Sequence, residues 1–275
     1  MDYKEDFTPE IEYQRVQDAV RRRKARRTAL LCLIVLVPLG AFVFGLKWVD
    51  TYLTGGSLLA TVDTVSRYVP NGDKNSFIFQ DGTVVTVNAG SRLTYPSRFG
   101  FALREVALDG EAYFEVSKNP FRPFVVKLPG GQKVRVLGTS FNVRAFGEGD
   151  EVEVALDEGK VELHNGAEVY TLAPGQALLY DRASDRAEIS ACNTLLKSQW
   201  TRNAVCFNGA PIDEIASGLS RIFDVKIYIA PGVDRQRLYT FSAKRSDLDL
   251  ILDELQIIAP ICVKRTGDDI MISNR

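Results

Sequence analysis

The spacing of hydrophobic and polar positions divides the chain into three regions. In the first, an uncharged run over residues 28–46 follows six basic residues within residues 21–27. A helix over residues 28–49, rising about 1.5 Å per residue, is long enough to cross a hydrocarbon core of about 30 Å. Basic residues are retained on the cytoplasmic side of a membrane, and no positive charge follows Lys47 until Arg67. The pattern predicts a single transmembrane helix, with the N-terminus in the cytoplasm and the C-terminus outside.

A cleaved signal peptide and a buried helix of a soluble domain are the other interpretations of this run. A signal peptide has a short charged leader and a small-x-small cleavage site. Here the leader has 27 residues, and residues 45–49 offer no such site. A buried helix that is apolar on all sides at this length is rare outside membranes. We therefore expect a signal anchor, with a short cytoplasmic tail over residues 1–27 and a linker over residues 50–69.

Short segments with alternating hydrophobic and polar positions fill the second region, residues 70–190. The clearest segment surrounds Gly110, where we expect a bulge or a bend. Its hydrophobic positions are Val106, Leu108, Ala112, Phe114 and Val116, and its polar positions are Glu105, Asp109, Glu111 and Glu115. Residues 77–80 and 83–88 predict a hairpin with a two-residue Asp81-Gly82 turn. Since no helical period occurs, the region predicts an all-β domain of about ten short strands, a sandwich or a solenoid.

Helical spacing appears twice in the third region, residues 195–275. The first predicted helix has Pro211 in its first turn, and the second has Ser246 or Asp247 as its cap and Pro260 beyond its end. Their hydrophobic stripes are Ile212, Ile215, Ala216, Leu219 and Ile222 in one and Leu248, Ile251, Leu252, Leu255 and Ile258 in the other. Predicted strands lie at residues 225–229, 239–243, 261–264 and 270–273. The region predicts a small α+β domain with the order βαββαββ.

Composition excludes several classes of function. The net charge is −1, which gives no general attraction to nucleic acid. Outside the predicted span lie Cys192, Cys206 and Cys262, which can form at most one disulfide, and a Cys206–Cys262 bond is geometrically conceivable. The single histidine, His164, has no cysteine cluster with which to bind zinc, and we expect it at the surface. We expect no metal and no cofactor.

Glu111 and Glu115 share one face of a predicted strand, as the paired carboxylates of a glycosidase could. Alternating charge on an exposed strand face explains them more simply. No GxSxG motif accompanies the lone histidine. The sequence therefore predicts a protein that is not an enzyme.

Three blocks of residues, in order, closely resemble the FecR family of membrane-bound anti-sigma regulators. The first is Asp81-Gly82-Thr83 with residues 88–96. The second is LDGEAYFEV at residues 108–116, followed by Pro123-Phe124-Val125-Val126. The third is VLGTSFNV at residues 136–143, followed by VALDEGKV at residues 154–161. Residues 195–275 are similar to the secretin/TonB short N-terminal fold that follows this domain in many members.

The resemblance implies a protein of the bacterial inner membrane that regulates an extracytoplasmic-function sigma factor. In the periplasm it would contact a TonB-dependent outer-membrane transducer and relay ligand uptake to the sigma factor. The family's cytoplasmic sigma-binding region is often longer than 27 residues. A narrow stripe of Tyr13, Val16 and Val20 on a helix starting near Thr8 is the candidate sigma contact. A tail used only for topology is the alternative, and the protein would then be a membrane-tethered periplasmic adaptor without sigma control.

Strand addition at a sheet edge is the expected mode of transducer binding. The candidate edge is Ile270, Met271, Ile272 and Ser273, or else residues 239–243. A second candidate site is the Gly138-Thr139 bond, because some relatives of the family cleave themselves at a Gly-Thr bond. There the Thr139 hydroxyl would attack the Gly138 carbonyl. The hydrophobic positions change parity across residues 137–140, so a plain β-bulge with glycine at the bend is the alternative.

Overall fold

A computed structural model of the protein describes residues 37–46, 63–100, 103–245, 247–267 and 269–275. The chain forms two compact units, Met1–Thr61 and Val62–Arg275. In the first unit, residues 37–46 are helical. Within the described residues, no helix combines the length and the apolar character needed to cross a membrane. Most of the predicted span over residues 28–49 and the candidate sigma contact at Tyr13, Val16 and Val20 lie outside the described residues.

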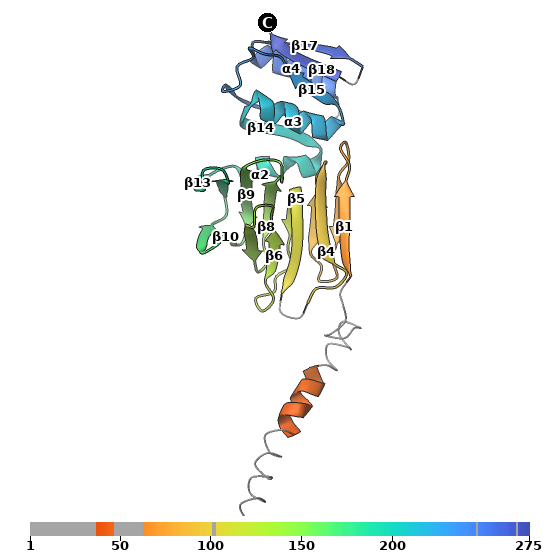
Figure 1. Cartoon of the computed structure of the whole chain (residues 1–275), viewed down its shortest axis with the longest axis vertical. Helices are drawn as coiled ribbons and strands as arrows, with labels where there is room; N and C mark the ends of the chain where they lie inside the picture. Colours follow the sequence, from red (N-terminus) through yellow and green to blue (C-terminus); the bar gives the residue numbers. More distant parts are fainter. Residues whose placement is uncertain (1–36, 47–62, 101–102, 246, 268) are drawn as a thin grey trace, which may run out of the picture. The chain divides into compact units, whose positions relative to one another are not determined.

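A β-sandwich forms the first part of the second unit (Figure 1). One sheet has the order β1-β4-β5-β6-β7-β10-β11 and the other β2-β3-β5-β8-β9-β12-β13, so that the two share strand β5. The strands are β1 Thr64–Val69, β2 Asn75–Ile78, β3 Val84–Val87, β4 Ser91–Pro96, β5 Arg104–Glu115, β6 Phe124–Lys127, β7 Lys133–Val136, β8 Ser140–Ala145, β9 Glu151–Glu158, β10 Val161–Asn165, β11 Glu168–Leu172, β12 Gln176–Asp181 and β13 Arg186–Ala191. The predicted all-β domain is confirmed and is the sandwich of the two architectures expected, with thirteen strands in the described residues where about ten were expected.

Strand β5 bends at Gly110 and passes from one sheet to the other. Leu108 and Asp109 pair with β4 in the first sheet, and Gly110 to Glu115 pair with β8 in the second. More buried and less buried positions alternate along β5 through Gly110 without a shift, so the strand bends at Gly110 and has no bulge there. Gly110 has φ +127°, and a Cβ there would lie 2.2 Å from Ser91 Oγ. Glycine is required because a side chain has neither the conformation nor the space.

The core of the sandwich combines side chains from both sheets. Phe114 of β5 stacks on Phe141 of β8 with ring centroids 5.0 Å apart, and Phe124 of β6 packs edge-on against Phe114 at 6.1 Å. All three are fully buried, as are Val134 and Leu178 from the outer strands β7 and β12. The hydrophobic residues at every second position of β5 supply much of this core, as the period-two pattern predicted.

The β2–β3 hairpin has a longer turn than predicted. Ile78 pairs with Val84, Phe79 N donates to Thr83 O at 2.9 Å, and Gly82 N donates back to Phe79 O at 3.0 Å. Gln80, Asp81 and Gly82 therefore form a three-residue loop, with Gly82 at φ +82°. The prediction of a two-residue Asp81-Gly82 turn is wrong. Gly82 instead occupies the left-handed position that follows a type I turn in a three-residue loop.

The remainder of the second unit is the C-terminal domain, which has the predicted βαββαββ order. Its elements are β14 Ala204–Pro211, α3 Ile212–Phe223, β15 Lys226–Ile229, β16 Leu238–Lys244, α4 Leu248–Ile258, β17 Ile261–Thr266 and β18 Asp269–Asn274. Strands β14 and β16 form a two-stranded sheet, and β15-β18-β17 form a three-stranded sheet. The apolar stripes of both helices pack into one core with these strands, apart from Ile258, which was predicted in the second stripe but is 41% exposed. Asp247 caps α4 by accepting a bond from Asp249 N, and Pro211 is the residue before α3 and not in its first turn.

A short connector, which the sequence patterns did not indicate, joins the two parts of this unit. It contains helix α2, Thr194–Lys197, and the 3₁₀ helix η1, Gln199–Arg202. Cys192 precedes the connector and has a free thiol, as have Cys206 on β14 and Cys262 on β17. The conceivable Cys206–Cys262 bond is therefore absent, since the two cysteines lie on strands of different sheets.

Candidate functional site

Charged side chains gather where the C-terminal domain meets the sandwich. We call this cluster the domain junction, and it consists of Glu111, Arg144, Glu153, Lys197, Glu214 and Arg221 around a cavity of about 110 Å³. The first three belong to strands β5, β8 and β9 of the sandwich. Lys197 belongs to α2, and Glu214 and Arg221 to α3. Residues from five elements therefore meet at one place.

Arg144 is the centre of the domain junction. Its guanidinium lies 2.5 Å from Glu214 across the junction, and 3.4 Å from Glu153 and 3.7 Å from Glu151 on its own side. Burial opposes its charge, but the attraction of Glu153, Glu214 and Glu111 outweighs burial and raises the pKa of Arg144 further. One cation thus compensates several carboxylates from both domains.

Glu153 alternates with the core residues Val152 and Val154 along β9, yet it is itself buried, at 9% exposure. Helix α2 packs on strand β9, and the Lys197 ammonium pairs with the Glu153 carboxylate. The alternating pattern along β9 places Glu153 on the face opposite to Val152 and Val154, and the connector covers that face. A charge that looks solvated in a sequence pattern becomes part of an interdomain ion pair.

Glu111 is likewise not the solvated charge that the sequence pattern indicated. Its carboxylate accepts hydrogen bonds from Asn88 Nδ2 at 2.7 Å and Asn142 Nδ2 at 3.0 Å. Burial raises the pKa of Glu111, and Asn142, Arg144 and Asn88 offset part of that rise. Asn142 also accepts a bond from the indole Nε1 of Trp200 at 3.1 Å, so the polar chain runs from the sandwich into η1.

Further contacts join the loop between β1 and β2 to the C-terminal domain. Gly72 N donates to Arg221 O at 2.8 Å, and the Arg245 guanidinium donates to Gly72 O and to Ile222 O. The Lys74 ammonium donates to Thr201 O and to Asn203 Oδ1, both at 2.7 Å, at the end of η1. These bonds satisfy carbonyls that a helix end leaves without a partner, so the loop serves as the cap of two helices.

Arg221 completes the domain junction from the side of α3. Its guanidinium lies 4.2 Å from the ring centroid of Phe146, the residue that follows β8. A cation over an aromatic face in a partly desolvated site contributes roughly 1 kcal/mol. Burial lowers the pKa of Arg221, with Glu111 opposing that shift. The arrangement as a whole is a joint between two domains.

The Gly138-Thr139 bond lies in the connection between two sheets. Strand β7 pairs in the first sheet and β8 in the second, so the change of parity across residues 137–140 is a crossover. A register shift of the kind expected for a β-bulge lies at the end of this segment, between Ser140 and Phe141, where β8 pairs with β9. Thr139 is 4% exposed, and its hydroxyl donates to Lys160 O at 3.1 Å.

The candidate transducer edge at Ile270, Met271, Ile272 and Ser273 is not a sheet edge. These residues belong to β18, which is the central strand of its sheet and pairs with β15 on one side and β17 on the other. The hydrophobicity of Ile270 and Ile272 reflects burial in the core. Residues 239–243 belong to β16, which has a strand neighbour on one side only in the described residues.

Comparison with known proteins assigns both parts of the second unit. Two family models match: FecR protein over residues 67–162, and FecR, C-terminal over residues 204–272. Two crystal structures of a candidate anti-sigma factor from Parabacteroides distasonis ATCC 8503 have the same fold, at 26% identity with TM-scores of 0.73 and 0.74. The aligned parts cover 77% and 78% of this chain and 99% and 100% of those chains. No curated protein matches.

These matches place the sandwich and the small α+β domain in a regulator of the anti-sigma class. The chain belongs to the FecR family of anti-sigma regulators. Members of this class act by binding a sigma factor and are regulators rather than enzymes.

Proposed function

We propose that the protein spans the bacterial inner membrane once and relays a periplasmic signal to an extracytoplasmic-function sigma factor. The signal would come from a TonB-dependent outer-membrane transducer that binds the C-terminal domain. The observation that carries the proposal is the match of both parts of the second unit to the FecR family. The basic cluster at residues 21–27 before an uncharged run supports the orientation.

Strand β16 is the edge best suited to receive a strand from the transducer. It has seven residues and one strand neighbour in the described part of the chain, whereas β15 has only four residues. On β17, the amide of Val263 is already occupied by Gln256 Oε1 at 2.9 Å. Strand β14 is interrupted by a register shift between Phe207 and Ala210, and such irregularities disfavour edge pairing.

The amide of Ser242 points away from β14 and is available to a partner. Arg245 N donates to Asn203 O at 2.9 Å, which fixes the hydrogen-bonded pairs of the β14–β16 ladder. Because hydrogen-bonded and non-bonded pairs alternate, Val205 and Ala243 bond to each other, and the groups of Ser242 face outward. An added strand would bond to these outward groups and need little side-chain matching.

Crosslinking of the full-length protein in cells, followed by mass spectrometry, tests the relay. We expect a sigma factor joined to residues 1–27 and a TonB-dependent transducer joined to the C-terminal domain. Ser242→Pro should abolish transducer capture, because proline removes the outward amide while an edge strand tolerates it. Ser242→Ala is the matched control and should retain capture. Capture of the transducer without any sigma factor would indicate the adaptor, and retained capture by Ser242→Pro would exclude strand addition at β16.

A further inference from the structure

The loops at one end of the sandwich present two strongly exposed apolar side chains. Phe121, between β5 and β6, is 90% exposed, the largest value among the large hydrophobic residues of the described chain. Ile78, at the end of β2, is 77% exposed. We call this end the loop tip and define it by Ile78, Phe121, Lys118 and Arg122. Apolar side chains that gather on one exposed surface often mark a site of contact with a protein or a membrane.

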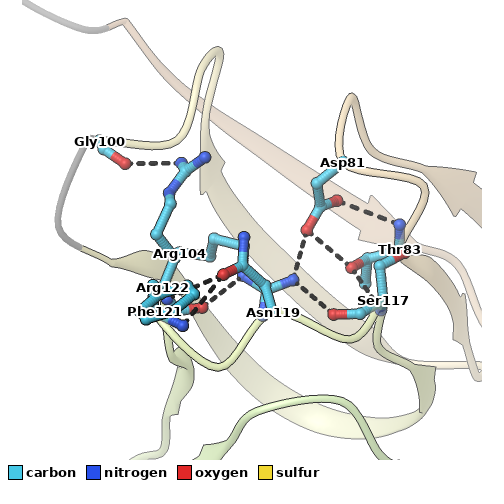
Figure 2. A network of polar contacts seen from close by, with 8 residues as sticks. All are labelled: Asp81, Thr83, Gly100, Arg104, Ser117, Asn119, Phe121 and Arg122. Atoms are coloured by element: carbon cyan, nitrogen blue, oxygen red, sulfur yellow. Dashed lines mark hydrogen bonds and ion pairs between the residues drawn. The ribbon is translucent and has the colours of Figure 1, made fainter.

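Hydrogen bonds hold Phe121 in its exposed position (Figure 2). Asn119 Oδ1 accepts bonds from the backbone amides of Phe121 and Arg122, each at 3.1 Å. The Arg122 guanidinium donates to Gly100 O at 2.6 Å, which ties this loop to the loop between β4 and β5. The loop is thereby preorganised, and Phe121 is kept from folding back onto the sandwich.

Arg104 fastens the hairpin that carries Ile78 to the same end (Figure 2). This arginine is 1% exposed, and its guanidinium donates to Asp81 Oδ2 at 2.7 Å and to Ser117 O at 2.9 Å. A buried ion pair with good geometry resists displacement, because separating the charges leaves one of them uncompensated. The two apolar side chains are therefore held on rigid supports.

The chain enters the sandwich at this same end. Ser97 N donates to Asp63 O at 2.7 Å, and Thr64 pairs with Pro96 at the start of β1. The β4–β5 loop follows, and it is the loop bonded to Arg122. Its Phe99 packs against Phe79, the residue after Ile78, with ring centroids 5.1 Å apart. Only residues 47–62 separate this entry point from the helical residues 37–46. Sixteen residues span at most about 55 Å, whatever their conformation.

We propose that the loop tip is a membrane-contact surface, with Phe121 and Ile78 entering the lipid interface of the membrane that anchors the chain. The inference rests on the proposed transmembrane anchor. Exposed aromatic and aliphatic side chains flanked by basic residues are the composition that enters the headgroup region. Lys118, 81% exposed, and Arg122 supply positive charge toward lipid phosphates, although Glu158 lies 3.5 Å from the Lys118 ammonium. Because the tether keeps the surface close to lipid, weak affinity is sufficient for steady contact.

Fluorescence of the full-length protein in nanodiscs containing anionic lipid tests the proposal. Phe121→Trp is compared with Ile257→Trp, a matched control on helix α4 that is 82% exposed. The signal of the parent protein, which contains Trp48 and Trp200, is subtracted from both. With brominated acyl chains we expect the tryptophan at position 121 to be quenched at least about threefold more than the one at position 257. Equal quenching of the two would overturn the proposal.

Two further measurements distinguish a failure of the membrane-contact proposal from a failure of the proposed transmembrane anchor. Co-flotation of the parent protein with vesicles after a carbonate wash tests the anchor alone, and its failure would overturn both. If flotation holds and the tryptophan at position 121 emits as in water, only the membrane contact is overturned. Blue-shifted emission without quenching would mean that protein covers the loop tip, which also overturns the proposal.

Discussion

The Arg144 guanidinium lies 2.5 Å from the Glu214 carboxylate, and this contact pairs a strand of the sandwich with the first turn of helix α3. A carboxylate in the first turn of a helix is also stabilised by the helix dipole. Since neither side chain is more than 30% exposed, water screens the pair less than it screens a surface pair. The two domains are therefore joined by charge as well as by backbone contacts.

Replacing Arg144 by methionine should lower the free energy of unfolding by about 3 kcal/mol, because Glu153 and Glu214 lose their shared cation. The matched control is Arg265→Met. Arg265 pairs with Asp249 at 2.7 Å, but both side chains are largely exposed. Exposed pairs contribute little, so the control should change stability by less than about 0.5 kcal/mol. Urea denaturation followed by circular dichroism measures both, and equal stabilities of the two variants would show that the junction pair adds nothing.

The raised pKa of Glu111 predicts a pH dependence of stability. The native carboxyl binds its proton more tightly than the unfolded one, so the native state holds more protons between the ordinary and the raised pKa. The free energy of unfolding therefore falls as pH rises through that window, and the contribution is fully present below it. Glu111→Gln has no titrating group at this position and should lack that component.

Other groups titrate in the same range, so the informative quantity is the difference between the wild type and Glu111→Gln. Asp81, for example, has a lowered pKa, because the bonds from Arg104 and Thr83 outweigh its burial, and it adds stability as pH rises. Thermal unfolding of both proteins from pH 4 to pH 8 provides the comparison. Wild-type stability should decline relative to the variant as pH rises, and parallel curves would contradict a raised pKa at Glu111.

Gly110→Ala should strongly destabilise the sandwich, because its Cβ would lie 2.2 Å from Ser91 Oγ at a backbone angle of φ +127°. We expect a loss of at least about 3 kcal/mol from steric overlap and backbone strain together. Gly131 also has a positive φ, +93°, but no atom lies within 4 Å of its Cβ position. Gly131→Ala is therefore the control for strain alone and should cost about 1 kcal/mol. Comparable losses for the two variants would show that the contact with Ser91 does not matter.

The hydrophobic patterns predicted the elements well, because each strand or helix buries one face in its own domain. The buried positions from Val106 to Val116 and from Leu248 to Leu255 follow directly from periods of two and about 3.6. These local periods do not specify which strands become edges. Ile270 and Ile272 looked equally suited to an edge or a centre, and only the pairing with both β15 and β17 decides between them.

The domain junction was not predictable for the same reason. Glu111 and Glu153 alternate with core residues, as solvated charges do on an exposed strand. Their burial results from α2 and η1 packing over that face, and these short helices carry no periodic signal of their own. The available signal was chemical: Asn88 directly follows the apolar strand β3 and Asn142 lies within β8, and such polar residues beside core positions often mark a buried network.

Self-cleavage at Gly138-Thr139 remains a prediction that replacing the hydroxyl would test. The Thr139 oxygen would attack the Gly138 carbonyl carbon, its proton would pass to the departing amide nitrogen, and water would then hydrolyse the resulting ester. Gly138 has φ +155°, and a Cβ there would lie 2.5 Å from Lys118 Cα, so only glycine fits before this bond. This reaction would give two fragments of the wild type on a denaturing gel, an intact Thr139→Ala chain, and cleavage of Thr139→Ser, which keeps a hydroxyl. Two fragments from Thr139→Ala, or an intact wild-type chain, would exclude this reaction.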